Sequence, residues 1–326
     1  MRESLFAIVL AAGKGTRMKS DLPKVLHPVF FAPMVCHVLE TIGHLNPVET
    51  VVITGHQAEK VEKALEDFPV RFARQNVQMG TGHAVLMAEE SFKDMTGTVI
   101  ILCGDTPLIK DTTLRAMVAG HHSQQSTLSV MTTIVDDPAN YGRIVTDGQN
   151  SIKCIVEEKD ASPSERQIRE VNAGIYCVDL SFLFSALRQV GTDNKQGEIY
   201  LTDIVGIARK EGHEVGHFVC ADPLEITGVN SRVELAQANV IMQQRRNQEL
   251  MLAGVTMIHP DSIFVEKSVT IGQDTEIHSH CLLEGSTVIG KECHLGPFCH
   301  LNNCQVQDRA IVNSFAKLSD QVIACE

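Results

Sequence analysis

An aliphatic residue recurs at every sixth position near the C-terminal end of the chain. The series runs through Val265, Ile271, Ile277, Leu283, Ile289, Leu295 and Leu301. This period is typical of a parallel β-helix, in which each turn supplies an inward aliphatic side chain and stacked turns complete the core. The residue two positions earlier is often small or carries a thiol, as at Thr275, Cys281, Thr287, Cys293 and Cys299. We expect all of these side chains to pack inward, in about three to four coils of about eighteen residues each.

The first 228 residues follow another pattern, in which short β-branched runs alternate with segments of helical periodicity. Most of the predicted strands are continuous apolar runs, as buried parallel strands are, and they cover residues 5–12, 48–55, 99–104, 128–135, 152–157 and 173–178. Crossover helices are predicted over residues 34–45, 57–68 and 81–92, where apolar residues recur at three-and-four spacing. This alternation predicts an α/β fold with a Rossmann-like, mostly parallel sheet.

A long helix is predicted between these two parts. Ser231 and Glu234 form the pattern of a helix-capping box, and Gly254 is a typical helix stop. We therefore divide the chain into an α/β domain over 1–228, a connecting helix over 229–254 and a short left-handed parallel β-helix over 255–326.

The composition restricts the partners and the compartment. Lys and Arg number 28 against 40 Asp and Glu, so the net charge of -12 disfavours nucleic acid and anionic membranes as partners. No apolar run approaches the roughly 18 residues that a membrane span needs. The ten cysteines are scattered and form no C-x-x-C pair, which favours a reduced, cytoplasmic setting.

The segment GKGTRMKSDLPK directly follows the first predicted strand. Its glycines let backbone N–H groups approach phosphate oxygens, and Lys14, Arg17 and Lys24 supply the positive charge that a polyphosphate requires. The glycines do not fit the P-loop or the dinucleotide-binding fingerprint. On its own, GKG more often marks a Gly-rich turn with a solvated basic face than a phosphate site.

The segment belongs to an ordered series of motifs. LAAGKGTRM and SDLPKVLH are followed by QMGTGHA, GDTPLI, DDPANYGRI, IVEEKDA, EVNAGIY, GEIYLTD and GVNSR. This series resembles the nucleotide-diphosphate-sugar pyrophosphorylases, and more closely the uridylyltransferase domain of the bifunctional enzymes that make UDP-N-acetylglucosamine. The resemblance covers nearly the whole chain. It implies a GT-A-like nucleotidyltransferase (pyrophosphorylase) domain over 1–228.

The resemblance implies transfer of UMP from UTP to N-acetylglucosamine-1-phosphate with release of pyrophosphate, which yields a cell-wall peptidoglycan precursor. It places the nucleotide against Leu10, Ala11 and Gly13, with the uracil edge against Gln75, Gly80 and Thr81. It places the sugar near Cys103, Gly104, Gly142, Glu157 and Asn172. The departing pyrophosphate would be neutralised by Arg17 and Lys24, and Mg²⁺ would be held by Asp105 and Asn230.

The residue types also suit this chemistry without the resemblance. A sugar phosphate is already anionic, so in-line displacement at phosphorus needs positioning and charge stabilisation rather than a strong base. Simpler roles remain open for Asp105, which could cap the turn after its strand, and for Asn230, which could begin the next helix. Glu157 and Glu158 face opposite ways on a strand, and we expect one of them to be solvated.

Two departures from the family affect the expected activity. Cys103 stands where the bacterial enzymes commonly carry Tyr, which puts the identity of the sugar in question. The repeats stop at Glu326, so we expect no acetyltransferase activity. Alternatives are a nucleotidyltransferase for another sugar-1-phosphate or NTP, and a non-catalytic nucleotide-sugar sensor.

The histidines of the repeats, His278, His280, His294 and His300, show no recognisable ligand pattern, and we expect surface or packing roles for them. Hexapeptide proteins usually pack as homotrimers through their repeats, and the sequence leaves open whether this chain does so.

Overall fold

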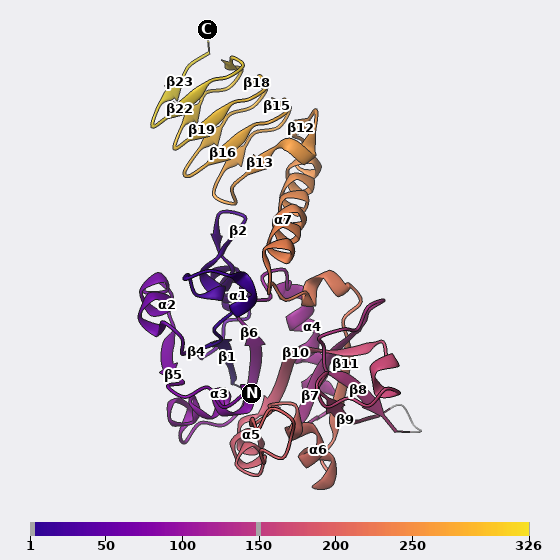
Figure 1. The fold of residues 1–326 in the computed structure, drawn as a ribbon. Coiled ribbons are helices and arrows are strands. Elements are labelled where there is room, and N and C mark those ends of the chain that lie inside the picture. The colour runs from indigo at the N-terminus through magenta and orange to yellow at the C-terminus, as the bar shows by residue number, and fades with distance from the viewer. Residues whose placement is uncertain (1–3, 148–150, 326) are drawn as a thin grey trace. The chain divides into compact units, whose positions relative to one another are not determined.

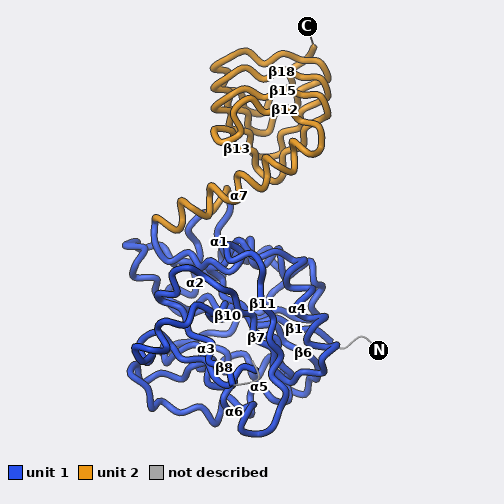
Figure 2. The backbone as a smooth tube through the Cα atoms, turned by 90° about the vertical axis from the view of Figure 1, so that its right-hand side faces the viewer, with its two compact units in different colours: residues 1–28, 32–232 blue, residues 29–31, 233–326 orange. Residues whose placement is uncertain are grey.

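The computed structural model describes residues 4–147 and 151–325. The chain forms two compact units (Figure 2). The larger unit comprises residues 1–28 and 32–232, and the smaller one comprises residues 29–31 and 233–326. No helix of the described chain is both long enough and apolar enough to cross a membrane.

The larger unit is built on a nine-stranded sheet (Figure 1). Seven of its strands follow the order β11-β7-β10-β6-β1-β4-β5; of the other two, β8 pairs with β10 and β9 pairs with β8. Its strands are β1 (Leu5–Ala11), β4 (Glu49–Thr54), β5 (Arg71–Arg74), β6 (Thr98–Cys103), β7 (Leu128–Ile134), β8 (Arg143–Thr146), β9 (Ile152–Val156), β10 (Glu170–Asp179) and β11 (Val215–Val219). β1 pairs in parallel with β4 and β6, whereas β10 runs antiparallel to β6 and β7. The predicted Rossmann-like sheet is confirmed. Strands β5, β8 and β11 were not predicted.

Helices connect these strands. They are α1 (Met34–Gly43), α2 (Ala58–Ala64), α3 (Thr81–Leu86), α4 (Asp111–Ser123), α5 (Leu180–Leu187) and α6 (Asp203–Lys210). The single helix predicted over 81–92 is wrong, because α3 ends at Leu86 and a separate 3₁₀ turn follows at Glu89–Phe92.

Strand β1 is buried on both faces of the sheet. Phe6 and Ile8 share one core with Ala84 and Val85 of α3. Val9 is also fully buried, and because side chains alternate along a strand it faces the other side of the sheet. This two-sided burial explains the continuous apolar sequence of β1 and directs its polar loop to the carboxyl edge of the sheet.

The smaller unit contains α7 (Arg232–Leu252) from Val233 onward. The helix ends two residues before Gly254, which has a φ of +99°. Two buried amides in α7 hold the first coil. Gln243 donates to the carbonyl of Ile263 at 2.8 Å, and Asn247 donates to the same carbonyl at 2.9 Å. The hairpin formed by β2 (Pro28–Val29) and β3 (Ala32–Pro33) turns at Phe30, whose N–H donates to Asn239 in α7.

The repeats form a parallel β-helix with three four-stranded sheets (Figure 1). One sheet contains β12 (Thr256–Met257), β15 (Glu276–Ile277), β18 (His294–Leu295) and β21 (Ile311–Val312). The second contains β13 (Phe264–Val265), β16 (Leu282–Glu284), β19 (His300–Asn302) and β22 (Lys317–Ser319), and the third contains β14 (Thr270–Ile271), β17 (Val288–Ile289), β20 (Gln305–Val306) and β23 (Val322–Ile323).

The predicted inward positions of the repeats are confirmed. Six of the seven aliphatic residues are buried, and Ile271 is partly buried against the same core. The five small or thiol-bearing positions are at most 2% exposed. Cys281, Cys293 and Cys299 are therefore packing residues.

The β-helix core supplies a test of this packing. Leu295 is fully buried in β18, whereas Ile311 of the neighbouring strand β21 is 66% exposed. Leu295→Ala should reduce the free energy of unfolding of the β-helix by about 2–5 kcal/mol, because it removes buried contacts and leaves a cavity. Ile311→Ala should cost less than about 1 kcal/mol. Hydrogen exchange of the β12–β23 amides measures both, and equal effects would contradict the assignment of the core.

Candidate active site

A cavity of about 280 Å³ opens at the carboxyl ends of β1 and β6. Leu10 and Cys103 are register partners on these two parallel strands, so the loops that follow them emerge at the same edge of the sheet. The lining includes Leu10, Ala11, Ala12, Gly13, Lys24, Val25, Gln75, Gln78, Gly80, Thr81, Ala84, Cys103, Asp105 and Glu198. Nine of the predicted site residues therefore share one cavity.

The basic loop is held by a glycine and an arginine. Gly15 has a φ of +60°, and a Cβ placed on it would lie 2.4 Å from Cβ of Lys24. Only glycine allows this backbone conformation together with such close packing of the lysine. Arg232 donates to the carbonyl of Met18 at 3.3 Å, which anchors the turn that carries Arg17. Arg17 itself is exposed and is not part of the cavity lining.

Lys24 brings two oxygen-bearing side chains together. Its ammonium forms an ion pair with Asp105 and donates to Oδ1 of Asn230 at 3.0 Å. The segment that carries Asn230 is fixed beside Asp105, because the Val229 N–H donates to the Asp105 carbonyl at 2.8 Å. A carboxylate and an amide oxygen thus converge on one positive charge at the rim of the cavity. This donor set suits a hard divalent cation such as Mg²⁺.

The far wall of the cavity is formed by the QMGTGHA segment. Gly80 has a φ of +103°, and a Cβ there would lie 2.5 Å from the Ile199 carbonyl. The amide of Gln75 donates to the Gly80 carbonyl at 3.0 Å, and the Thr81 hydroxyl accepts from the Leu201 N–H at 3.0 Å. Both contacts fix the wall without using the carbonyl end of Gln75.

A second group of predicted residues lies around β8 and β10. Asn172 donates from its side chain to the Tyr176 hydroxyl at 2.7 Å, and its backbone N–H donates to the Gly142 carbonyl at 2.9 Å. A Cβ placed on Gly174 would lie 3.6 Å from Sγ of Cys103, which connects this group to the cavity lining. The structure therefore brings Gly142 and Asn172 together beside Cys103.

Burial raises the pKa values of several groups in this region, Cys103 and Glu157 among them. Burial, reinforced by the charge of Asp105, raises the pKa of the Cys103 thiol to about 12, so the thiol is neutral. Burial also raises the pKa of Glu157, and the nearby carboxylates of Asp203, Asp160 and Glu198 add to the effect. The Thr202 hydroxyl donates to Glu157 at 3.2 Å and partly offsets it.

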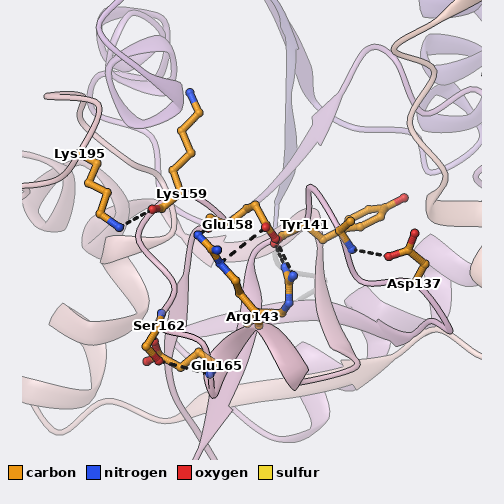
Figure 3. Close-up of polar contacts among 10 residues, drawn as sticks. Asp137, Tyr141, Arg143, Glu158, Lys159, Ser162, Glu165 and Lys195 are labelled. Carbon is orange, nitrogen blue, oxygen red and sulfur yellow. Dashed lines mark hydrogen bonds and ion pairs between the residues drawn. The ribbon is translucent and has the colours of Figure 1, made fainter.

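The residue next to Glu157 has a structural role. Glu158 accepts from the buried guanidinium of Arg143 at 2.5 Å (Figure 3). Arg143 also donates to the Tyr141 carbonyl. The two glutamates do not face opposite ways on a strand as expected, because β9 ends at Val156 and both follow it. Glu158 keeps 33% of its side chain exposed, and its ion pair ties the turn after β9 to the start of β8. The contact holds in place the segments that carry Gly142 and Glu157.

Sequence reasoning overlooked three polar residues of this region. Gln78 and Glu198 line the cavity, and Tyr176 is the hydrogen-bond partner of Asn172. All three lie inside motifs of the ordered series, so the motifs themselves were the available signal. Their separate roles depend on contacts that only the fold defines.

Comparison with known proteins gives one family. Residues 6–223 match the family model described as nucleotidyl transferase. A crystal structure from Bacillus anthracis, described as a glucose-1-phosphate thymidylyltransferase in complex with sucrose, has a TM-score of 0.60 at 24% identity. The aligned part covers 73% of this chain and 95% of the chain from Bacillus anthracis, and it shows that the two share a fold.

Three similar relatives carry the name bifunctional protein GlmU. The chain is 44% identical to that of Desulfotalea psychrophila over 99% of its own length and 95% of the relative. It is 44% identical to that of Geotalea daltonii, covering 93% of this chain and 66% of the relative. The protein from Exiguobacterium sp. is 45% identical and is covered over 68% of its length.

The matched model and these relatives agree with the arrangement of the cavity at the strand ends, and the chain belongs to the nucleotidyl transferase family, within its group of bifunctional GlmU proteins.

Proposed function

We propose that this chain is a uridylyltransferase that makes UDP-N-acetylglucosamine and pyrophosphate from UTP and N-acetylglucosamine-1-phosphate. The observation that supports it most strongly is the convergence of Asp105 and Asn230 on the Lys24 ammonium, at the rim of a cavity lined by the phosphate loop. A polyphosphate bound at this edge would meet backbone N–H groups and a fixed positive charge.

The proposed reaction is an in-line displacement. An oxygen of the sugar phosphate attacks the α-phosphorus of UTP, a new P–O bond forms, and the bond to the β-phosphate oxygen breaks to release pyrophosphate. The chain positions the two substrates and neutralises the leaving group through Lys24 and Arg17. A Mg²⁺ ion held by Asp105 and Asn230 would supply further charge stabilisation of the phosphate oxygens.

Substrate selection is assigned to two walls of the site. We propose that Leu10, Ala11 and Gly13 contact the nucleotide, and that Gln75, Gly80 and Thr81 contact the uracil. The carbonyl end of Gln75 would accept from the N3–H of uracil, a donor that cytosine lacks at this position. Gly142, Glu157 and Asn172 would contact the sugar, next to Cys103 and Gly104.

The proposal also covers the compartment in which the protein works, its assembly and the range of its activity. Ten free cysteines suit a reducing environment such as the cytoplasm. The division into domains at residues 228 and 254 stays a prediction. So does the homotrimer, which a measurement of the molecular mass in solution tests. Uridylyl transfer is the only activity that we assign to this chain.

A substrate panel tests the proposed function. Pyrophosphate release is measured with Mg²⁺, each of the four common NTPs, and either N-acetylglucosamine-1-phosphate or glucose-1-phosphate. The proposal expects the highest kcat/KM for UTP with the N-acetylated sugar. A preference for another pair supports the alternative nucleotidyltransferase, and no release with any pair supports a non-catalytic sensor. Either result would refute the proposal.

Arg17→Ala tests the assigned neutralisation of the leaving group. Loss of one positive charge beside the departing pyrophosphate should lower kcat at least about 100-fold. Its exposed position predicts an unchanged thermal midpoint. Lys93→Ala, at another exposed cation, is the matched control and should keep the full rate. Pyrophosphate release measures both, and a rate near that of the native chain in Arg17→Ala would remove this residue from the mechanism.

Gly15→Ala tests the packing of Lys24 over the loop. The added methyl group would clash with Lys24 and strain a backbone with a φ of +60°, so Lys24 must move. We expect kcat/KM to fall at least about tenfold and the unfolding free energy to fall by about 1 kcal/mol. Gly120→Ala is the control, since its helical site is open. Unchanged kinetics in Gly15→Ala would show that the lysine position is not critical.

Glu157→Gln tests the raised pKa of this carboxyl. The folded state favours the protonated form of Glu157, so the ionised carboxylate lowers the free energy of unfolding at neutral pH. This destabilisation disappears once the pH falls below 4.5, the ordinary pKa of a glutamate carboxyl. The variant should therefore melt at a higher temperature than the native chain at pH 7.5 and at the same temperature near pH 4. The exposed Glu66→Gln should show no such difference. Lower stability of Glu157→Gln at pH 7.5 would contradict the assignment.

A further inference from the structure

Two histidines and a glutamate meet on the outer surface of the β-helix, within the smaller unit. Glu276 of β15 and His294 of β18 are register partners on adjacent parallel strands. Their neighbours Ile277 and Leu295 are fully buried, so both polar side chains project outward. His278 lies two residues after Glu276 and projects from the same face.

The three side chains converge on one point. Oε1 of Glu276 lies 2.7 Å from Nε2 of His278 and 3.5 Å from Nδ1 of His294. All three ligand atoms lie within 4.8 Å of one another. In a tetrahedral zinc site with bonds of about 2.0–2.2 Å, donor atoms are separated by about 3.4 Å. Small rotations of the imidazole rings would bring the three donors to that separation.

A carboxylate that accepts from one imidazole is an ordinary surface contact, and the same β-helix contains such a pair. Glu284 lies 2.5 Å from Nε2 of His300 on the neighbouring sheet. The group around Glu276 differs, because a second imidazole shares the same carboxylate oxygen and its ring lies 4.8 Å from the first. Two imidazoles and one carboxylate form the ligand set of open zinc sites, which leave a position for water.

We propose that Glu276, His278 and His294 bind a divalent transition metal ion such as Zn²⁺ or Co²⁺, with solvent in the remaining positions. The side chains are 32–47% exposed, so an ion can enter from solvent. The imidazole donors select such ions over Mg²⁺, which prefers oxygen ligands. The net charge of -12 favours cation binding. The bound ion would link two consecutive coils of the β-helix.

Titration with Co²⁺ tests this site, because the visible absorption of the ion reports its geometry and ligands. The full chain is used in excess Mg²⁺, which competes for oxygen-rich sites. We expect one equivalent of Co²⁺ with imidazole–carboxylate ligation, and a rise in thermal midpoint on adding Zn²⁺. The double variant His278→Gln/His294→Gln should bind Co²⁺ at least about tenfold more weakly. His300→Gln, which alters the simple pair, should bind as the native chain does.

Several outcomes would overturn the proposal. They are absence of Co²⁺ binding by the native chain, equal binding by the double variant, and equal weakening by His300→Gln. Glu276→Gln gives a second check, since it keeps both histidines and should also weaken binding. Circular dichroism confirms that each variant is folded. Because pyrophosphate release is not part of this readout, the result stands apart from that of the proposed uridylyl transfer.

Discussion

The ion pair between Lys24 and Asp105, with Asn230 completing it, is the contact on which the proposed site depends. It joins three segments that are far apart in the chain: the basic loop after β1, the turn after β6 and the segment before α7. The carboxylate of Asp105 and the amide oxygen of Asn230 both contact the Lys24 ammonium, and removing this cation would leave a partly buried carboxylate without its counter-charge, which is costly. The same arrangement that stabilises the structure therefore marks a place where positive charge can meet phosphate.

The sheet explains why these segments meet. Burial of β1 on both faces leaves its carboxyl end as the place where polar residues can reach solvent, and its parallel partner β6 ends beside it. Glycines then allow the loops to approach closely, Gly15 beneath Lys24 and Gly80 against Ile199. On the sugar side, the ion pair of Arg143 with Glu158 fixes the segments that would contact the ligand.

Much of this could be predicted from the sequence. The six-residue period defined the inward positions of the β-helix, and the apolar runs located the central strands. Contacts that depend on register could not be predicted. The separation of Glu276 from His294 is one full coil, so their meeting requires the pairing of β15 with β18. Likewise, nothing in IVEEKDA indicates that Glu158 pairs with Arg143, since that contact requires β8 and β9 to pair as antiparallel strands.

The proposed reaction requires Asp105 to be a ligand of the catalytic centre rather than a turn cap. The most direct measurement is pyrophosphate release by Asp105→Asn with UTP, N-acetylglucosamine-1-phosphate and Mg²⁺. This change keeps the shape of the side chain and removes its charge. We expect kcat to fall at least about 100-fold, with only partial recovery on adding Mg²⁺ and with the fold intact. A rate equal to that of the native chain would contradict this role of Asp105.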